Sequence, residues 1–298
     1  EYRELQKILS TYIDNIPGMI APDGRLHAKF LQTGTTTGRM SSQDPNLQNI
    51  PNKSGLGMEV REAFKSGPGT KLVAFDYSQI EIRIAAFLSH DEKLLEIFRK
   101  GEDVHTAVAA EVFGVPLDKV DKEMRRKAKV INFGIMYGMG VNSLKVNLGS
   151  TREEAQKYLD EYFNKFNGLA RYLENVKSET EQRGYTETFF GRRRYFEGLR
   201  SKIPFIRAMA ERMAINAPIQ GTEADFIKLA MVKIDEFLVK EQLDEKVRLI
   251  LQVHDELVYE VEEKNANDVA PKIEKIMESL VSPLFSQFLE QHHSHFFL

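Results

Sequence analysis

The feature that most constrains the fold is a pair of apolar runs in residues 247–263, VRLILQVHDELVYEVEE, which flank a short polar segment. Apolar runs of this length around a polar tight turn predict two antiparallel strands joined as a hairpin. The predicted turn, His254–Glu256, carries two adjacent carboxylates. The chain is therefore expected to contain an antiparallel sheet with an acidic hairpin tip.

A second strand is predicted over KLVAFD, which ends at Asp76, and a helix over the residues that follow. Asp76 and Asp255 lie almost 180 residues apart, but carboxylates at strand ends and turn tips can converge on one sheet. Such a pair suits Mg²⁺, a hard cation completed by phosphate oxygens and water. Two ions roughly 3.5–4 Å apart stabilise the attacking and leaving oxygens of phosphoryl transfer. The alternative is that each aspartate simply caps a turn.

The rest of the chain is expected to be mainly helical. A short amphipathic helix is predicted in 1–20, followed by a polar stretch over 21–70 with a long loop at 33–52. Helices are predicted over 101–180, with turns at 114–116 and 138–149, and β and turn structure over 185–197. Further helices are predicted over 204–240, with a polar interruption at 218–222, and over 266–281. A long polar loop usually binds a partner, although a surface linker is the alternative. The mixture indicates α+β, or α/β with large helical insertions.

Composition excludes several kinds of site. The chain has no cysteine, so disulfides, thiolate zinc sites and cysteine nucleophiles are excluded. No apolar run approaches the roughly 18 residues of a membrane-spanning helix, and we expect no membrane partner. The net charge is −3, so a nucleic-acid partner would need a locally basic surface.

Arg125, Lys129, Phe133 and Tyr137 recur every four residues within KEMRRKAKVINFGIMYGMG (122–140) and would form one slanted stripe on a helix. Its cationic end could hold a triphosphate, and its aromatic end could support a nucleobase or sugar. The alternative is a solvated basic face with two core aromatic residues.

Three further segments carry weaker signals. FGRRRYF (190–196) suits contacts with a nucleic-acid backbone, or forms a charged surface turn. His105 follows an acidic stretch and is by default a structural histidine. Gln220, close to Pro218 and Gly221, is either a minor-groove reader or a helix-breaking residue.

Taken together, these segments resemble a known family. DYSQIEIR (76–83), RRKAKVINFGIMYG (125–138) and LQVHDELV (251–258) resemble motifs A, B and C of the family A DNA polymerases, of the bacterial DNA polymerase I type. TGRMSSQDPNLQNIP (37–51), FGRRRY (190–195) and AERMAINAPIQGTEAD (210–225) resemble further signature blocks, so the likeness covers roughly residues 1–282.

The resemblance implies an α+β right-hand polymerase fold, with an antiparallel palm sheet and a large helical fingers subdomain. Residues 1–20 would end the thumb, 21–80 and 245–298 would build the palm, and 81–244 the fingers. The thumb and the exonuclease-like domain of relatives would be largely absent. The tail SPLFSQFLEQHHSHFFL departs from the family pattern, and its HHSH (292–295) either binds a metal or is simply exposed.

The resemblance also implies roles for individual residues. Asp76 and Asp255, with the Tyr77 carbonyl, would be the metal ligands, and Glu256 an auxiliary acid. Glu81 resembles the steric gate against a ribose 2′-hydroxyl, and Lys129 is the candidate general acid for pyrophosphate. The full set of implied nucleotide-binding residues is Arg125, Lys129, His105, Phe133, Tyr137, Gln79 and Glu81. The implied DNA-binding residues are Arg39, Asn49, Gln220, His254, Arg192, Arg193 and Arg194.

The implied activity is template-directed addition of dNTPs to a primer 3′-hydroxyl with pyrophosphate release. It would use two Mg²⁺ ions, for which Mn²⁺ can substitute. The expected partners are primer–template DNA and dNTPs, and a separate chain carrying a thumb and exonuclease-like domain is a further candidate. We expect a cytoplasmic, nucleoid-associated protein if the source is bacterial or a phage, and an organelle is left open.

Two other functions are consistent with the same fold. One is a single-subunit RNA polymerase, against which Glu81 argues because such an enzyme must admit the 2′-hydroxyl. The other is a non-catalytic DNA-binding remnant, against which the intact Asp76, Asp255, Arg125 and Lys129 argue.

Overall fold

The computed structural model describes residues 2–51 and 56–286, and the predicted tail motif at 292–295 lies outside them. The chain divides into two compact units. The sheet unit comprises described residues up to Tyr77 together with Ile227–Glu278, and the helical unit comprises Ser78–Phe226 together with residues 279–286. The assignment of these units to palm and fingers stays a prediction.

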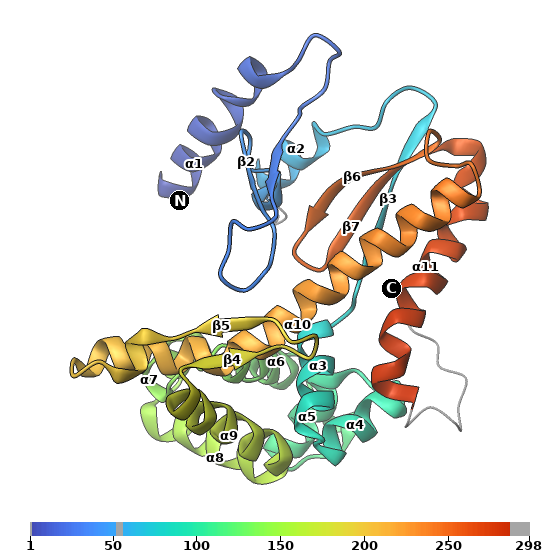
Figure 1. The fold of residues 1–298 in the computed structure, drawn as a ribbon. Helices are drawn as coiled ribbons and strands as arrows, with labels where there is room; N and C mark the ends of the chain where they lie inside the picture. Colours follow the sequence, from blue (N-terminus) through green and yellow to red (C-terminus); the bar gives the residue numbers. More distant parts are fainter. Residues whose placement is uncertain (1, 52–55, 287–298) are drawn as a thin grey trace. The chain divides into compact units, whose positions relative to one another are not determined.

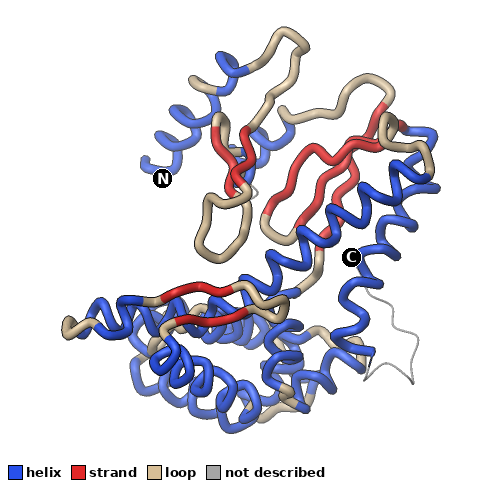
Figure 2. The backbone as a smooth tube through the Cα atoms, in the orientation of Figure 1, coloured by secondary structure: helices blue, strands red, loops and turns tan. Residues whose placement is uncertain are grey.

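The sheet unit is built on three antiparallel strands in the order β3-β7-β6 (Figures 1 and 2). They are β3 (Thr70–Asp76), β6 (Val247–Val253) and β7 (Glu256–Glu262). The predicted hairpin is confirmed, with a turn of two residues, His254 and Asp255, because Glu256 already pairs with Val253 as the first residue of β7. His254 has φ 55°, the positive φ that two-residue hairpin turns require.

The core of the sheet unit lies on one face of this sheet. Its buried side chains alternate along β7 and recur at helical spacing on α11 (Glu263–Ser286) and on the part of α10 (Pro204–Lys240) that belongs to this unit. They are Leu257, Tyr259 and Val261 on β7, Val269, Ile273 and Met277 on α11, and Ala230, Ile234 and Leu238 on α10. Each large apolar side chain contributes roughly 1.5–3 kcal/mol by burial. The Tyr77 hydroxyl donates to the Met277 carbonyl at 3.0 Å and so fixes the segment that follows β3.

The first part of the sheet unit consists of short elements. They are α1 (Tyr2–Ile8), η1 (Leu9–Ile13), η2 (Ile16–Met19), β1 (Lys29–Leu31), β2 (Ser41–Gln43), η3 (Leu47–Asn49) and α2 (Leu56–Glu62). The expectation of one long loop over 33–52 is therefore wrong. The segment folds because buried Ser42 donates to the Pro45 carbonyl and accepts from the Leu47 amide, both at 3.2 Å.

The helical unit contains most of the helices. They are α3 (Ile80–Ser89), α4 (Glu92–Arg99), α5 (Val104–Phe113), η4 (Leu117–Lys119), α6 (Lys122–Met136), α7 (Val141–Leu148), α8 (Arg152–Lys165), α9 (Asn167–Arg183) and the first part of α10, together with β4 (Tyr185–Glu187), β5 (Arg193–Tyr195) and η5 (Glu197–Arg200). Side chains cap four of these starts: Asp91, Asp103, Asp121 and Thr151 each accept a hydrogen bond from a backbone amide three residues later. The short β4–β5 hairpin confirms the β structure predicted over 185–197.

Two predicted details of the helical unit are wrong. α6 ends at Met136, close to where a turn was expected to begin, but α7 occupies much of the turn expected at 138–149. Gly138 makes this break, because it has φ 63° and a Cβ there would lie 3.1 Å from the Arg212 Cα. In contrast, α10 continues through Pro218, so the interpretation of Gln220 as a helix-breaking residue is wrong.

The fold class is thus α+β with antiparallel sheets, as predicted. Among the helices of the described residues, none combines the length and the apolar character needed to cross a membrane.

Candidate functional site

Carboxylates gather at one end of the three-stranded sheet. Asp76, the last residue of β3, pairs in register with Glu256, the first residue of β7. The Tyr77 amide donates to the Asp255 carbonyl at 3.3 Å, which joins the end of β3 to the hairpin turn. The structure therefore brings Asp76 together with Asp255 and Glu256, two predicted site residues that lie almost 180 positions further along the chain.

The electrostatics of this acidic end are unfavourable without a cation. Asp76 as a whole is exposed, yet partial burial of its carboxylate, followed by the charges of Asp255 and Glu256, raises its pKa to about 6. Among the described residues no group of three or more His, Cys, Asp or Glu is arranged to hold a metal ion. The oxygen-only donors and their mutual repulsion nevertheless fit Mg²⁺, provided that backbone carbonyl and phosphate oxygens supply further ligands.

The cationic part of the predicted stripe lies on α6, in the helical unit. Arg125 makes a bidentate contact with Asp103, from Nε to Oδ1 at 2.9 Å and from Nη2 to Oδ2 at 2.8 Å. Burial alone would raise the pKa of Asp103, but hydrogen bonds from Arg125 and Thr106 lower it to about 2. The Lys129 Nζ lies 5.9 Å from the centre of the Phe133 ring. The two predicted triphosphate ligands therefore sit on one helix, and one of them already has a carboxylate partner.

His105 lies beside this stripe. Its ring is buried and its centre lies 5.8 Å from that of Phe133. Burial, opposed by Asp103 but assisted by Lys129 and Arg125, lowers the pKa of His105 to about 4, so the ring is neutral near pH 7. The Asn132 Nδ2 is 3.1 Å from His105 Nδ1. With Nδ1 accepting this hydrogen bond, the proton of the neutral ring is on Nε2, which can then donate to a phosphate oxygen.

The aromatic part of the stripe is held by Glu81. Tyr137 caps the C-terminus of α6 instead of lying within the helix, yet its ring stacks on Phe133 with centres 6.5 Å apart and an angle of 16°. The Tyr137 hydroxyl donates to the buried Glu81 carboxylate, at 3.0 Å to Oε2 and 3.3 Å to Oε1. Gln79, with φ 58°, precedes α3 and accepts the Ile82 and Arg83 amides at 3.1 Å through its carbonyl. The predicted nucleotide-pocket residues of this unit thus surround the start of α3 and the end of α6.

The predicted DNA-binding residues are dispersed. In the sheet unit, His254 is exposed in the hairpin turn, and its carbonyl accepts from Gln252 Nε2 at 2.5 Å. Asn49 is exposed at the end of η3, where its carbonyl accepts from the Tyr12 hydroxyl. Arg39 is half-buried just before β2. Gln220 is half-buried in the part of α10 that belongs to the helical unit.

The three arginines of the β4–β5 hairpin are engaged within the helical unit. Arg192 forms an ion pair with Asp225, and Arg193 pairs with Glu187 at 2.7 Å. Arg194 stacks on Phe196 with its guanidinium carbon 4.8 Å from the ring centre, and burial lowers the pKa of Arg194. Contacts with a DNA backbone stay a prediction, and they would have to compete with these partners.

Sequence reasoning missed the residues that position the predicted ones. Asp103 and Asn132 hold Arg125 and His105, and Asp225 holds Arg192. Each pair joins residues at least 22 positions apart. The spacing of residues within one segment cannot reveal a contact between segments so far apart. The acidic stretch before His105 was the one feature of the sequence that pointed to Asp103.

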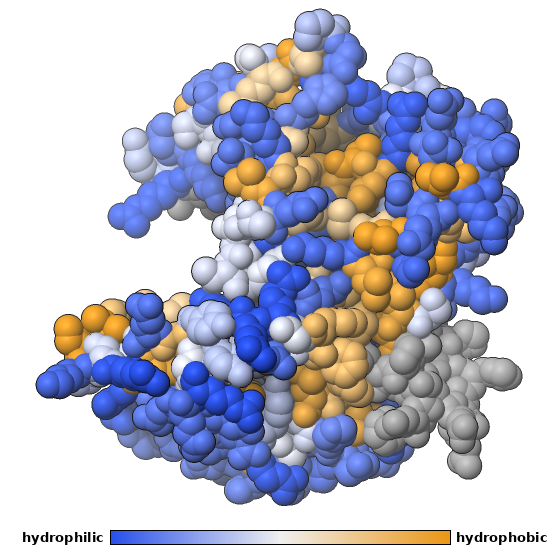
Figure 3. Space-filling model, viewed as in Figure 1, coloured by the Kyte–Doolittle hydropathy of each residue, from blue (hydrophilic) through white to orange (hydrophobic). Residues whose placement is uncertain are grey.

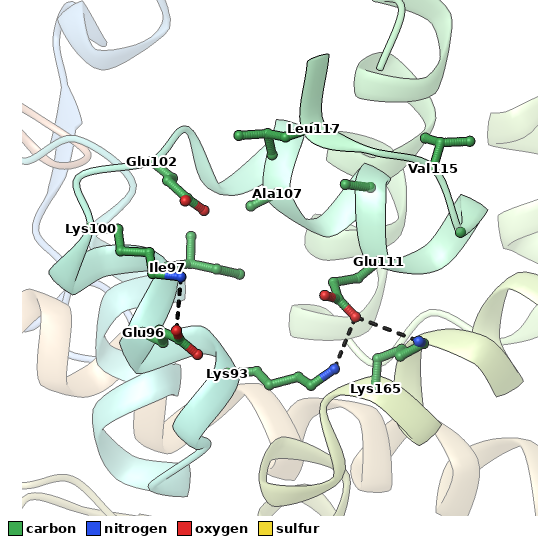
Figure 4. Close-up of a pocket in the computed structure, with 12 residues that line it drawn as sticks. Lys93, Glu96, Ile97, Lys100, Glu102, Ala107, Glu111, Val115, Leu117 and Lys165 are labelled. Carbon is green, nitrogen blue, oxygen red and sulfur yellow. Dashed lines mark hydrogen bonds and ion pairs between the residues drawn. The ribbon is translucent and has the colours of Figure 1, made fainter. Parts of the chain in front are cut away.

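A separate cavity of about 460 Å³ lies between α4, α5 and η4 of the helical unit and contains none of the predicted site residues (Figure 4). Most of its rim charges are matched internally: Glu111 binds Lys93 at 2.9 Å and Lys165 at 3.6 Å, and Lys100 binds Glu96 at 2.8 Å. Glu102 also lines the cavity and forms no ion pair with the other residues drawn in Figure 4.

Comparisons with known proteins agree with the geometry. A family-wide sequence model described as DNA polymerase family A matches residues 1–288. The thermostable DNA polymerase I of Thermus aquaticus is 50% identical over 281 residues, which make up 94% of this chain and 33% of that protein. The DNA polymerase I of Pseudomonas aeruginosa is 49% identical over 278 residues, 93% of this chain and 30% of that protein. The chain thus spans about a third of the length of these curated relatives.

A solved structure shows the same fold. It is described as the POL domain of Pol1 from M. smegmatis in complex with DNA primer-template and dNTP. It matches with a TM-score of 0.89 and 42% sequence identity, covering 94% of this chain and 49% of that chain.

Proposed function

Because this chain belongs to DNA polymerase family A, we propose that it carries out template-directed addition of dNTPs to a primer 3′-hydroxyl. The observation that carries this proposal is the convergence of Asp76, Asp255 and Glu256 at one end of the sheet. The raised pKa of Asp76 supports a site made for cations, since a bound cation relieves the repulsion between these carboxylates.

In the proposed reaction, the primer 3′-oxygen loses its proton and bonds to the α-phosphorus of the dNTP. The bond from that phosphorus to the oxygen that bridges to the β-phosphate breaks, and pyrophosphate leaves. When bound, two Mg²⁺ ions would supply charge neutralisation at the attacking and leaving oxygens. Asp76 and Asp255 would hold them, with the Tyr77 carbonyl as a further ligand and Glu256 as an auxiliary acid. Near pH 8 the Asp76 carboxylate is ionised, because its pKa is about 6.

The helical unit would bind the triphosphate. Arg125 would exchange Asp103 for a phosphate, which the bidentate geometry of its guanidinium favours. Lys129 would add a second positive charge and protonate the leaving pyrophosphate. His105 would donate from Nε2, since Asn132 occupies its other ring nitrogen.

The stacked Phe133 and Tyr137 would line the nucleotide pocket together with Gln79. Glu81, held by the Tyr137 hydroxyl, would exclude a ribose 2′-hydroxyl. Arg39, Gln220 and His254 would contact the primer-terminal region, and Asn49 the template–primer junction.

Primer extension tests the proposal. The purified protein should extend a labelled primer with dNTPs and poorly with rNTPs. Asp76→Ala and Asp255→Ala should each lose extension while primer–template binding changes little, because each removes a cation ligand and no phosphate contact. Glu262→Gln, at the opposite end of the sheet, is the matched control. Residual extension within about tenfold of wild type in either alanine variant would contradict the assignment.

The same assay separates the alternatives. Equal use of rNTPs and dNTPs would favour a single-subunit RNA polymerase. DNA binding without extension by the wild type, in Mg²⁺ or Mn²⁺, would favour a non-catalytic remnant.

A further inference from the structure

The cavity between α4, α5 and η4 shares no residue with the proposed polymerase site (Figure 4). Its volume of about 460 Å³ lies within the range of roughly 300–1,000 Å³ that is usual for sites of small organic ligands. The hollow exists because α5 lines it with its smallest residues: Ala107, Ala110 and Gly114 recur at helical spacing. No large apolar side chain of α5 therefore fills the space beside α4.

The cavity has an apolar lining between its charged groups. Ile97 of α4 and Ala107 of α5 are buried, Val115 is half-buried, and Leu117 of η4 is 46% exposed. In contrast, the visible surface over α8 and α9 of the same unit is mainly hydrophilic, in blue in Figure 3. The cavity thus offers apolar surface that a ligand with an apolar body can cover.

One side of the cavity carries a positive triad, formed by Lys93, Glu111 and Lys165. The two lysines share the single carboxylate, with Nζ–Oε2 distances of 2.9 Å from Lys93 and 3.6 Å from Lys165. The hydrogen bond from Lys93 lowers the pKa of Glu111, so this carboxylate is ionised near pH 7. Two lysines and one glutamate leave the triad with a net charge of +1.

The opposite side carries a negative triad, formed by Glu96, Lys100 and Glu102 (Figure 4). Lys100 binds Glu96 at 2.8 Å, and Glu102 is half-buried beside this pair. The hydrogen bond to Glu96 raises the pKa of Lys100, and the charge of Glu102 raises it further, so two acids act on one cation. This triad has a net charge of −1, the reverse of the other.

The separation of the two triads can be read along α4. Lys93 lies in the first turn of this helix and Lys100 is its C-cap, which places them roughly 10 Å apart along the axis at about 1.5 Å per residue. A ligand with one charge would match one triad and leave the other unmatched. The matching ligand therefore carries both charges, about as far apart as the ends of an extended chain of three amino-acid residues, roughly 10 Å.

We propose that this cavity binds a short zwitterion with an apolar body, of the chemical class of an apolar tripeptide with free termini. Its ammonium group would meet Glu102 in the negative triad, and its carboxylate would meet Lys93 and Lys165 in the positive triad. Its apolar side chains would cover Ile97 and Leu117. A longer protein segment brings at most one terminal charge and fits less well. The inference is independent of the proposed function, because the cavity contains no residue of that site.

Isothermal titration calorimetry with three peptides tests the charge requirement. The probe is the tripeptide alanyl-leucyl-alanine, and the matched controls are its N-acetyl form, which lacks the ammonium group, and its C-terminal amide, which lacks the carboxylate. The free tripeptide should bind with one site per chain. Each blocked peptide should bind about fivefold more weakly, which is the effect of losing one partly exposed ion pair.

Two charge variants assign each end of the ligand to a triad. Glu102→Gln should weaken binding of the free tripeptide about fivefold and leave the acetylated peptide unchanged, because that peptide has no ammonium group. Lys165→Gln should weaken the free tripeptide similarly and leave the amide unchanged. Glu153→Gln, at an exposed position of α8 outside the cavity lining, is the matched control.

A volume variant places the ligand inside the cavity. Ala110→Leu, at a half-buried position of α5, should fill the space and abolish binding of all three peptides. No binding of the free tripeptide, or equal binding of the free and blocked peptides, would overturn the inference. The same loss from Glu102→Gln for the free and the acetylated peptide would also overturn it, because that carboxylate would then not face the ammonium group.

Discussion

Replacing Asp76 by asparagine should stabilise the protein while removing its proposed activity. The asparagine side chain would keep the shape of the aspartate and remove the negative charge that faces Asp255 and Glu256. Because the pKa of Asp76 is raised in the folded state, ionising this residue favours unfolding. The penalty is absent at low pH, where the carboxyl is protonated in both states, and it is complete once the pH has risen above about 6.

The size of the effect follows from the shift. A rise from 3.8 to about 6 would correspond to about 3 kcal/mol if it were fully expressed as stability. Asp76 is exposed, so solvent screening reduces the expected gain to about 1 kcal/mol. For a chain of this length such a gain raises Tm by about 2 °C.

Thermal unfolding in EDTA at pH 7.5 and pH 4.5 measures this difference. Asp76→Asn should melt about 2 °C above the wild type at pH 7.5 and much closer to it at pH 4.5. Glu262→Gln should change Tm little at either pH. Added Mg²⁺ should raise the Tm of the wild type and not that of Asp76→Asn, because binding to the folded state is what stabilises it. A lower Tm for Asp76→Asn at pH 7.5 would refute the account of repulsion at the acidic end.

Three further predictions concern the nucleotide. Glu81→Ala should raise rNTP use relative to dNTP use, and an unchanged ratio of kcat/KM values would show that another residue is the gate. Phe133→Tyr should improve the use of dideoxynucleotides with little loss of dNTP activity, because a tyrosine hydroxyl can replace the hydrogen bond of the missing 3′-hydroxyl; flat termination efficiency would place Phe133 away from the sugar. Asp103→Asn keeps the α5 cap but weakens the ion pair with Arg125, so a phosphate competes with a weaker partner for Arg125. The KM for dNTPs should therefore fall about two- to fivefold, which corresponds to about 0.5–1 kcal/mol. A higher KM would mean that Asp103 positions Arg125 for phosphate.

The acidic end of the sheet was predictable because its pattern is local. Two apolar runs around a polar turn determine a hairpin, and an apolar strand that ends in aspartate determines where that carboxylate lies. The expectation that this strand is buried was wrong, because Phe75 is the one buried side chain of β3. The pairing of Asp76 with Glu256 was not predictable from periodicity, because the sequence of either segment alone does not determine the register between β3 and β7. The resemblance to a family supplied the link between them.

Other elements failed for identifiable physical reasons. The turn expected at 138–149 contains α7 instead, and only its beginning agrees with the structure, where Gly138 takes positive φ and Tyr137 caps α6. Conversely, Pro218 lies inside α10, where the long buried face of the helix outweighs the lost backbone hydrogen bond. The charged partners of the site residues, above all Asp103, were not predicted, because a salt bridge between residues 22 positions apart does not affect the local pattern of either segment.

The charged groups of the two units are balanced in opposite ways, and this difference has a functional consequence. Arg125 has Asp103 as a counter-ion, so its charge costs little before a nucleotide arrives, and a phosphate must then compete for it. Asp76 meets further carboxylates, so it destabilises the empty fold, and a cation that binds there recovers the lost free energy. Nucleotide affinity should therefore be limited by the acidic partners of the cations, and metal affinity increased by the repulsion among the acids. Neutralising Asp103 should then strengthen nucleotide binding at some cost in stability, whereas neutralising Asp76 should strengthen the fold at the cost of the metal site.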